Sequence, residues 1–163
     1  MPLTAASFNT SLAWTQQKAN TGQGATTQGP DSESFNLNGL NVTTFNQLYV
    51  ASFTLAASAS QTIDVTSLTN LVGESFGFGH TLTILILPVG SQCTVQPGGT
   101  NPLQWFFGGT GQSVVITAGG MLAYSEPVAG PGAAVSGSHK TLELTNSGAT
   151  SLTVSVVLLG STT

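Results

Sequence analysis

Charged side chains are scarce in this sequence. Only 5% of the 163 residues are Asp, Glu, Lys or Arg, whereas an average soluble domain contains roughly 25%. The surface must therefore consist mainly of short polar side chains, or much of it must be buried in contacts with other molecules. Because such a surface costs little to desolvate and lacks charge repulsion, the composition favours association. A neutral extracellular domain is the alternative.

Basic residues are scarcer still. Lys18 and Lys140 are the only two, and the net charge is −4. Binding to nucleic acid or to an anionic membrane requires several Lys or Arg on one face, so the sequence excludes both partners. The longest apolar run, Ile84–Leu87, is far shorter than the ~20 residues that span a bilayer. Met1–Ser7 lacks the charged and apolar segments of a signal peptide, so we expect none.

Residues that commonly carry catalysis or bind metals are few. The sequence has two histidines, His80 and His139, and a single cysteine, Cys93. A zinc site uses three or four ligands, often closely spaced, and this spacing is absent. A Ser-His-Asp triad with Asp64 is conceivable, but no Gly-x-Ser-x-Gly motif accompanies it. We therefore expect no catalytic residues, no metal and no cofactor, and we interpret Cys93 as a buried thiol.

Asp31 and Glu33 form the only close acidic pair. Two carboxylates on a loop could contribute ligands to a calcium site, which takes six to eight oxygen ligands. The simpler interpretation is a solvated acidic turn after Pro30, and we favour it because the ligand set is incomplete.

The first 44 residues differ in pattern from the rest of the chain. Residues 15–34 are small and polar and show neither helical nor strand periodicity, which is typical of a flexible arm. Phe8, Leu12 and Trp14 are the apolar residues that would anchor this extended arm. They would dock either on a neighbouring subunit or on the chain's own domain.

Residues 45–163 read as short strands separated by turns. Helix signals are weak, and the 20 glycines favour tight turns. We therefore predict an all-β domain, a β-sandwich or jelly roll of about eight or nine short antiparallel strands with an extended N-terminal arm. The segment Thr81–Leu87 is apolar on both faces, which predicts a central strand covered on both sides. The predicted strands lie within residues 45–55, 61–66, 81–87, 93–95, 103–107, 113–117, 121–125, 140–145 and 152–159.

Trp105-Phe106-Phe107 is the most distinctive apolar cluster. If the segment is a strand, Trp105 and Phe107 share one face and Phe106 takes the other. At least one face then lies in the core, and the other is a subunit interface or a ligand platform. We therefore place Trp105, Phe106 and Phe107 beside Phe8, Leu12 and Trp14 as candidate interface residues.

Several turn and strand segments after about residue 53 form a recognisable set: Ser60–Val65, Leu68–Thr69, Ala118–Gly120 with Ser125 downstream, Leu142–Ala149 and Val156–Gly160. In these patterns the chain resembles small phage or prophage virion structural proteins of the capsid-decorating or accessory type. The resemblance covers about two thirds of the chain, from about residue 53 to its end. It implies a virion location, with copies of the same chain and a major capsid or other virion protein as partners.

Together these observations predict a non-enzymatic virion structural protein, a capsid decoration, cement or accessory protein. It would assemble through its N-terminal arm and its β edges. The alternative is a secreted or surface carbohydrate-binding module that uses Trp105 or Tyr49 as a platform for sugar rings. A hydrolase with a hidden triad is the third and least favoured interpretation, because so few titratable residues are present.

Overall fold

The computed structural model describes residues 9–14, 31–36, 47–70, 73–125 and 133–162. The chain divides into two compact units: Ala5–Leu40, and Met1–Thr4 together with Asn41–Thr163. The sequence prediction instead places the boundary between residues 44 and 45, so Met1–Thr4 and residues 41–44 of the predicted arm belong to the larger unit. In the part of the chain that is described, no helix is long and apolar enough to cross a membrane.

The smaller unit contains a β-hairpin. Strands β1 (Asn9–Trp14) and β2 (Asp31–Asn36) pair antiparallel, with Asn9 opposite Asn36 and Trp14 opposite Asp31. The prediction that residues 15–34 contain no strand is therefore wrong for residues 31–34. Backbone N–H and C=O groups make the ladder, so a strand can form without an alternating apolar pattern.

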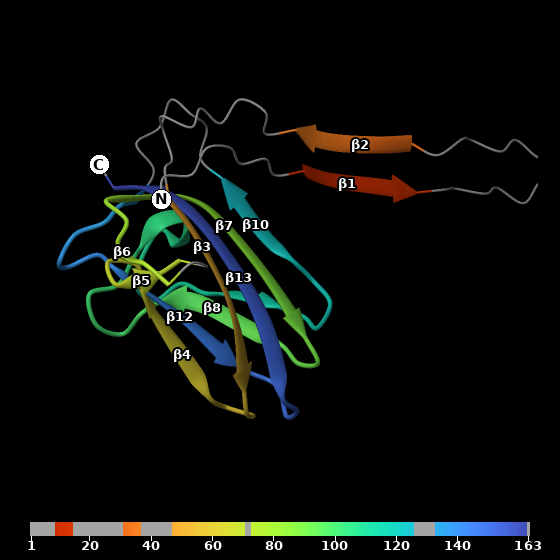
Figure 1. Ribbon diagram of the computed structural model, residues 1–163. Helices are drawn as coiled ribbons and strands as arrows, with labels where there is room; N and C mark the ends of the chain where they lie inside the picture. The colour runs from red at the N-terminus through yellow and green to blue at the C-terminus, as the bar shows by residue number, and fades with distance from the viewer. Residues whose placement is uncertain (1–8, 15–30, 37–46, 71–72, 126–132, 163) are drawn as a thin grey trace, which may run out of the picture. The chain divides into compact units, whose positions relative to one another are not determined.

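The larger unit is a β-sandwich (Figure 1). Its first sheet has the strand order β10-β7-β13-β3, and β11 also pairs with β7; its second sheet has the order β4-β12-β8-β9. A separate two-stranded ribbon joins β5 (Leu68–Thr69) to β6 (Ser75–Phe76). The sandwich strands are β3 (Gln47–Leu55), β4 (Ser60–Asp64), β7 (His80–Val89), β8 (Cys93–Pro97), β9 (Val114–Ile116), β10 (Leu122–Ser125), β11 (Ala133–Ala134), β12 (Thr141–Asn146) and β13 (Leu152–Ser161).

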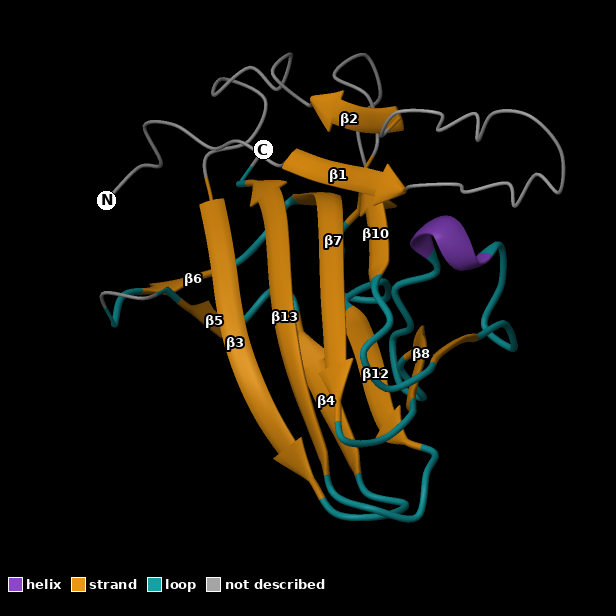
Figure 2. Cartoon of the chain, turned by 90° about the vertical axis from the view of Figure 1, so that its right-hand side faces the viewer, coloured by secondary structure: helices purple, strands orange, loops and turns teal. Residues whose placement is uncertain are grey.

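The strand order is that of a jelly roll. If β11 is set aside and the other eight sandwich strands are counted along the chain, the first sheet contains the sixth, third, eighth and first. The second sheet contains the second, seventh, fourth and fifth. This arrangement is the double Greek key of jelly rolls, and it confirms the predicted all-β fold. In Figure 2, β3, β13, β7 and β10 run side by side, with β4, β12 and β8 behind them.

The core lies between the two sheets and is built from alternate residues of facing strands. In the first sheet, Ile84 and Ile86 of β7 lie opposite Leu158 and Val156 of β13, and all four side chains are fully buried. The second sheet contributes fully buried side chains at every second position, such as Leu142 and Leu144 of β12 and Val95 of β8. The period of two in the sequence therefore places one face of each strand in the core.

The segment predicted as a strand at residues 103–107 is instead a short 3-10 helix, η1 (Trp105–Phe107). Trp105 has φ of +30° and Gly108, which ends the helix, has φ of +74°. Because the first residue of the aromatic run and the glycine after it both have positive φ, the backbone turns and cannot continue a β-ladder. The strand periodicity assumed for Trp105, Phe106 and Phe107 therefore does not apply.

Candidate interaction surfaces

The outer face of the second sheet is polar. Thr62 of β4, Glu143 of β12 and Gln96 of β8 form one row across three strands. The Gln96 Nε2 donates a hydrogen bond to the Glu143 Oε1 over 2.7 Å. In the next row, the hydroxyls of Ser60 and Thr145 lie 2.7 Å apart. This face is a hydrogen-bonded polar surface of the kind that antiparallel sheets present to water.

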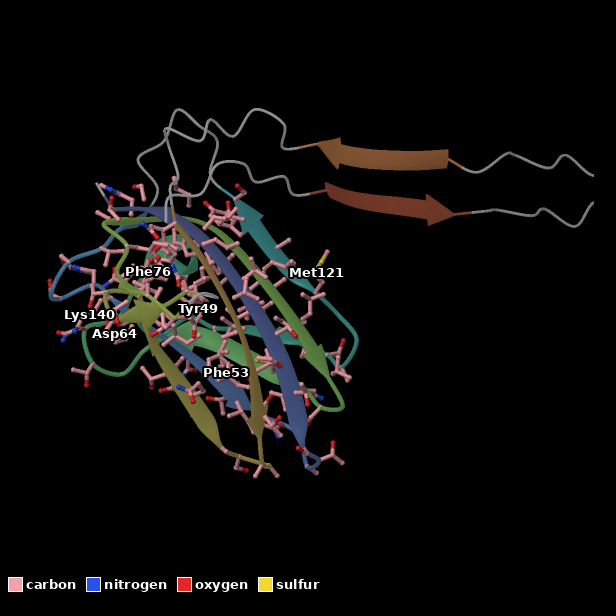
Figure 3. The ribbon with its side chains drawn as sticks, viewed as in Figure 1. Tyr49, Phe53, Asp64, Phe76, Met121 and Lys140 are labelled. Carbon is pink, nitrogen blue, oxygen red and sulfur yellow. The ribbon has the colours of Figure 1, made fainter. Side chains whose placement is uncertain are left out.

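An ion pair lies at the end of the same sheet (Figure 3). The Lys140 Nζ lies 2.7 Å from the Asp64 Oδ2. The Asp64 Oδ1 accepts hydrogen bonds from the Thr66 backbone N–H at 2.9 Å and from its hydroxyl at 2.6 Å. Burial alone would raise the pKa of Asp64, but these hydrogen bonds and the Lys140 charge hold it below its ordinary value. Asp64 therefore closes the turn after β4.

The outer face of the first sheet is different, because it is apolar across all four strands. Val50 of β3 pairs with Val157 of β13, Val157 with Leu85 of β7, and Leu85 with Ala123 of β10. All four alternate with residues that face the core, so they point away from the second sheet. They form a continuous apolar row across the sheet.

The neighbouring rows extend this patch. Leu48 and Leu159 pair on one side of the central row, and Leu87 and Val89 of β7 lie on the other. Figure 3 shows Met121 on the side of β7 and β10 away from the second sheet. We call these five residues and the central row of four the apolar face.

Exposure is uneven across the apolar face, because Leu159 is 6% exposed whereas Ala123 in the central row is exposed. The second sheet lies on the opposite side of the strands of the first sheet and does not cover the face. Residues near its centre are nevertheless half-buried: Val50, Val157, Leu85 and Leu87. Val89 is 62% exposed and Met121 is 50% exposed.

The prediction that residues 81–87 are covered on both sides holds for Thr81–Ile84, which are all buried, and is wrong for the outer side of Leu85 and Leu87. The central position of this strand is confirmed. Sequence reasoning missed this surface, even though the two-sided apolar pattern was its signal.

A second aromatic surface surrounds η1. The rings of Trp105 and Tyr124 meet edge to face, with centroids 5.5 Å apart. The Phe106 ring lies 4.8 Å from Tyr124 and stacks on Phe107 at 4.3 Å. Trp105, Phe106 and Tyr124 are half-buried, whereas Phe107 is 8% exposed and belongs to the core. This aromatic cluster thus joins the core to the surface.

The other predicted interface residues lie in the smaller unit. Leu12 and Trp14 are in β1, opposite Glu33 and Asp31 of β2. Phe8 lies outside the described residues. The structure therefore pairs the strand that carries the two apolar anchors with the strand that carries the acidic pair.

Tyr49, the second residue considered as a sugar platform, projects from β3 between the two sheets (Figure 3). It is half-buried and packs against the core. Burial raises its pKa. Its ring therefore serves mainly to close the edge of the sandwich.

The two histidines lie in different elements. His80 begins β7 and is half-buried. His139 lies on an exposed turn, where its Nδ1 is 3.2 Å from the Ser136 hydroxyl and 3.1 Å from the Ser138 hydroxyl. Asp64, the carboxylate considered for a triad, is paired with Lys140. Within the described ranges, no three His, Cys, Asp or Glu side chains gather as metal ligands would.

Comparisons with known proteins identify no family. No protein-family model matches the sequence, and no curated protein matches it. Among solved structures, the chain is similar to the cupin domain of Cnp3 from Schizosaccharomyces pombe, with 10% identity and a TM-score of 0.35. The match covers 92% of this chain and 85% of that domain.

Proposed function

We propose that this chain is a non-enzymatic virion structural protein of the capsid-decorating or accessory type. The observation that carries the proposal is the distribution of charge over the jelly roll. Among the described sandwich residues, Asp64, Glu74, Glu143 and Lys140 carry the charges, and all belong to the second sheet or to the β5–β6 ribbon. The first sheet is left with an uncharged, apolar outer face, which favours packing against protein.

Two further features support an assembly role. The fold is a jelly roll, an architecture that viral capsid proteins use, although lectins and cupins share it. The resemblance of residues 53–163 to phage structural proteins agrees with that use. Neither feature requires a catalytic residue or a cofactor, and the proposed partners are copies of the chain and a larger virion protein.

The N-terminal unit and the sheet edges would provide the attachment. Residues 5–40 form a unit of their own with a β-hairpin. β3 and β10 lie at the two ends of the strand order in the first sheet. An edge strand offers backbone donors and acceptors to a strand of another chain, so β-augmentation is a natural mode of assembly.

The virion location is tested by particle purification. Phage particles induced from cells that encode the chain are banded in a density gradient, and the fractions are probed for the chain by mass spectrometry. The proposal predicts that the chain bands with the particles and remains bound after a high-salt wash. Recovery of the chain only from particle-free fractions would contradict the virion location.

The role of the arm is tested separately by deletion of residues 1–44. This deletion removes the entire Ala5–Leu40 unit and leaves every strand of the sandwich in place. We expect the full-length chain to bind the particles and the shortened, folded chain to bind them at least tenfold more weakly. Equal binding by both would exclude the arm as the attachment.

Carbohydrate binding is a second candidate, favoured by one observation. Trp105 has φ of +30° beside the half-buried rings of Phe106 and Tyr124. A bulky residue in this conformation stores strain, and such strain often marks a ligand site. Titration with a panel of oligosaccharides, monitored by isothermal titration calorimetry, tests it. A saturable signal that Trp105→Ala abolishes and Tyr49→Phe retains would support sugar binding, whereas no response to any sugar would exclude it for that panel.

A further inference from the structure

We propose that the apolar face of the first sheet binds the same face of a second copy of this chain and forms a two-fold symmetric dimer. This inference rests on the proposed assembly function and adds the surface through which two copies meet. In such an interface each patch must be complementary to itself. The lack of charge and the arrangement of polar groups on the apolar face are compatible with this requirement. The area of the face bears on the stability of the dimer.

The apolar face can be placed against itself without electrostatic repulsion. Its four rows, counted across β3, β13, β7 and β10, contain only aliphatic, Met, Ala, Ser and Thr side chains. Like charges brought together in an interface cost several kcal/mol, which is why charged surfaces rarely pair with themselves. Because the described residues of this face carry no charge, a second copy brings no like charge against them.

The polar groups lie at the margins of the face. At one end, Thr54 pairs with Thr153 and Ser52 with Ser155. At the other end, the hydroxyl of Thr83 lies 2.9 Å from that of Ser125. The aliphatic row of Val50, Val157, Leu85 and Ala123 lies between them. The hydroxyls are open to solvent mainly at the first end, because Thr83 is only 3% exposed. An apolar centre with polar groups at its margin is the usual anatomy of a protein interface.

The area is sufficient for a stable dimer. The strands β3, β13, β7 and β10 have nine, ten, ten and four residues. At a spacing of about 4.8 Å and a rise of ~3.3 Å per residue, they cover on the order of 500 Å² in projection. The relief of the side chains raises the accessible area toward the ~800 Å² that each partner buries in a standard interface. Two sheets pack face to face in this way in β-sandwiches, at a separation of about 10 Å.

The second sheet provides an internal contrast. Its outer face carries Glu143 and Gln96 in the middle of a hydrogen-bonded polar row. Pairing that face with itself would bring two carboxylates together and desolvate them. The proposed dimer therefore uses the first sheet and leaves the second available to water or to a larger assembly.

The test is sedimentation velocity on the full-length chain and two matched variants. Ala123→Asp places a charge at an exposed position in the central row of the apolar face. Val115→Asp places the same charge on the outer face of the second sheet, where Val115 is 57% exposed. Met121→Asp is a second variant on the apolar face, in case Ala123→Asp lowers the melting temperature.

We expect the parent chain and Val115→Asp to sediment as dimers, and we expect Ala123→Asp and Met121→Asp to raise the dimer dissociation constant at least ~100-fold, because each buries two unpaired charges. A monomeric parent chain would overturn the proposal. A dimer that tolerates both aspartates would overturn this face as its interface. The latter result would leave the proposed virion function standing, since particle binding is measured independently.

Discussion

Asn146 is a polar residue with no exposed surface, and it connects two turns at one end of the sandwich. Its Nδ2 lies 3.0 Å from the carbonyl oxygens of Leu55 and Ala56 and 2.7 Å from that of Thr150. Its Oδ1 accepts a hydrogen bond from the backbone N–H of Gly148 at 3.1 Å. A single buried amide thus satisfies backbone groups more than 80 residues apart.

Replacement of this amide should cost much of the stability of the fold. We expect Asn146→Ala to lower the free energy of unfolding by about 3 kcal/mol, because several buried backbone groups lose their partner. Gln112→Ala, at an exposed loop position, should change it by less than ~0.5 kcal/mol. Urea unfolding monitored by circular dichroism measures both values. Equal stabilities of the two variants would contradict the structural role of Asn146.

Cys93 is fully buried, and burial raises the pKa of its thiol to about 11. The thiolate is the reactive form, so the native protein should contain very little of it near pH 8. We expect a disulfide reagent such as DTNB to label the native chain at least ~100-fold more slowly than the chain in urea. Rapid labelling of the native chain would show that β8 opens easily.

At the residue scale, the alternation of apolar residues along the sequence predicts whether a side chain is buried, but it does not predict the partners of a buried polar side chain. Cys93 alternates with Val95, and this local alternation correctly predicted a buried thiol. Asn146 lies in a turn-like sequence, Asn-Ser-Gly, although it continues the period of two that Leu142 and Leu144 set on the buried face of β12. Its partners Leu55 and Ala56 are brought to it by the sandwich, so its role depends on contacts that are distant in sequence.

At the scale of elements, the end of β4 and the start of β12 are held by the Asp64–Lys140 ion pair. Because the pKa of Asp64 is lower in the folded chain than its ordinary value of about 4, its contribution to stability is present above that value. The contribution is lost as the pH falls through the lower, folded pKa. The Asp64 side chain is one-third exposed, so the effect should be at most about 1 kcal/mol.

Comparison with Asp64→Asn tests this dependence. The variant should be slightly less stable than the parent chain at pH 7, and the difference should shrink when both are unfolded in urea near pH 3. The Lys140→Met variant should show the same convergence, because it removes the same ion pair. A difference that stays constant from pH 7 to pH 3 would mean that Asp64 acts through its turn alone.

The elements differ in how well the sequence predicts them. From Leu142 to Asn146, β12 alternates between buried and half-buried residues, and the sequence predicted the strand to within one residue at each end. The 103–107 strand failed because Trp105 adopts a left-handed backbone, which no propensity indicates for a bulky aromatic residue. β7 was placed correctly, but a sequence pattern does not distinguish cover by the chain's own second layer from cover by another molecule. For this reason the sequence did not predict that the apolar face is left uncovered by the second sheet.

At the scale of the whole molecule, the proposed assembly depends on apolar contact rather than on charge. Association should therefore change by less than twofold between about 0.05 and 0.5 M NaCl, because screening acts only on charges. Ammonium sulfate should strengthen it, since this salt is excluded from protein surfaces. Light scattering at a fixed protein concentration measures both trends. Dissociation in moderate NaCl would instead indicate an interface held by ion pairs.

The most direct test of the assembly account is the mass of the full-length protein in solution as a function of its concentration. The chain has a mass of 16.5 kDa. We expect analytical ultracentrifugation at micromolar concentrations to give about twice this value or a higher multiple, falling toward the monomer only on strong dilution. A mass of 16.5 kDa at every concentration, up to the solubility limit, would contradict self-assembly.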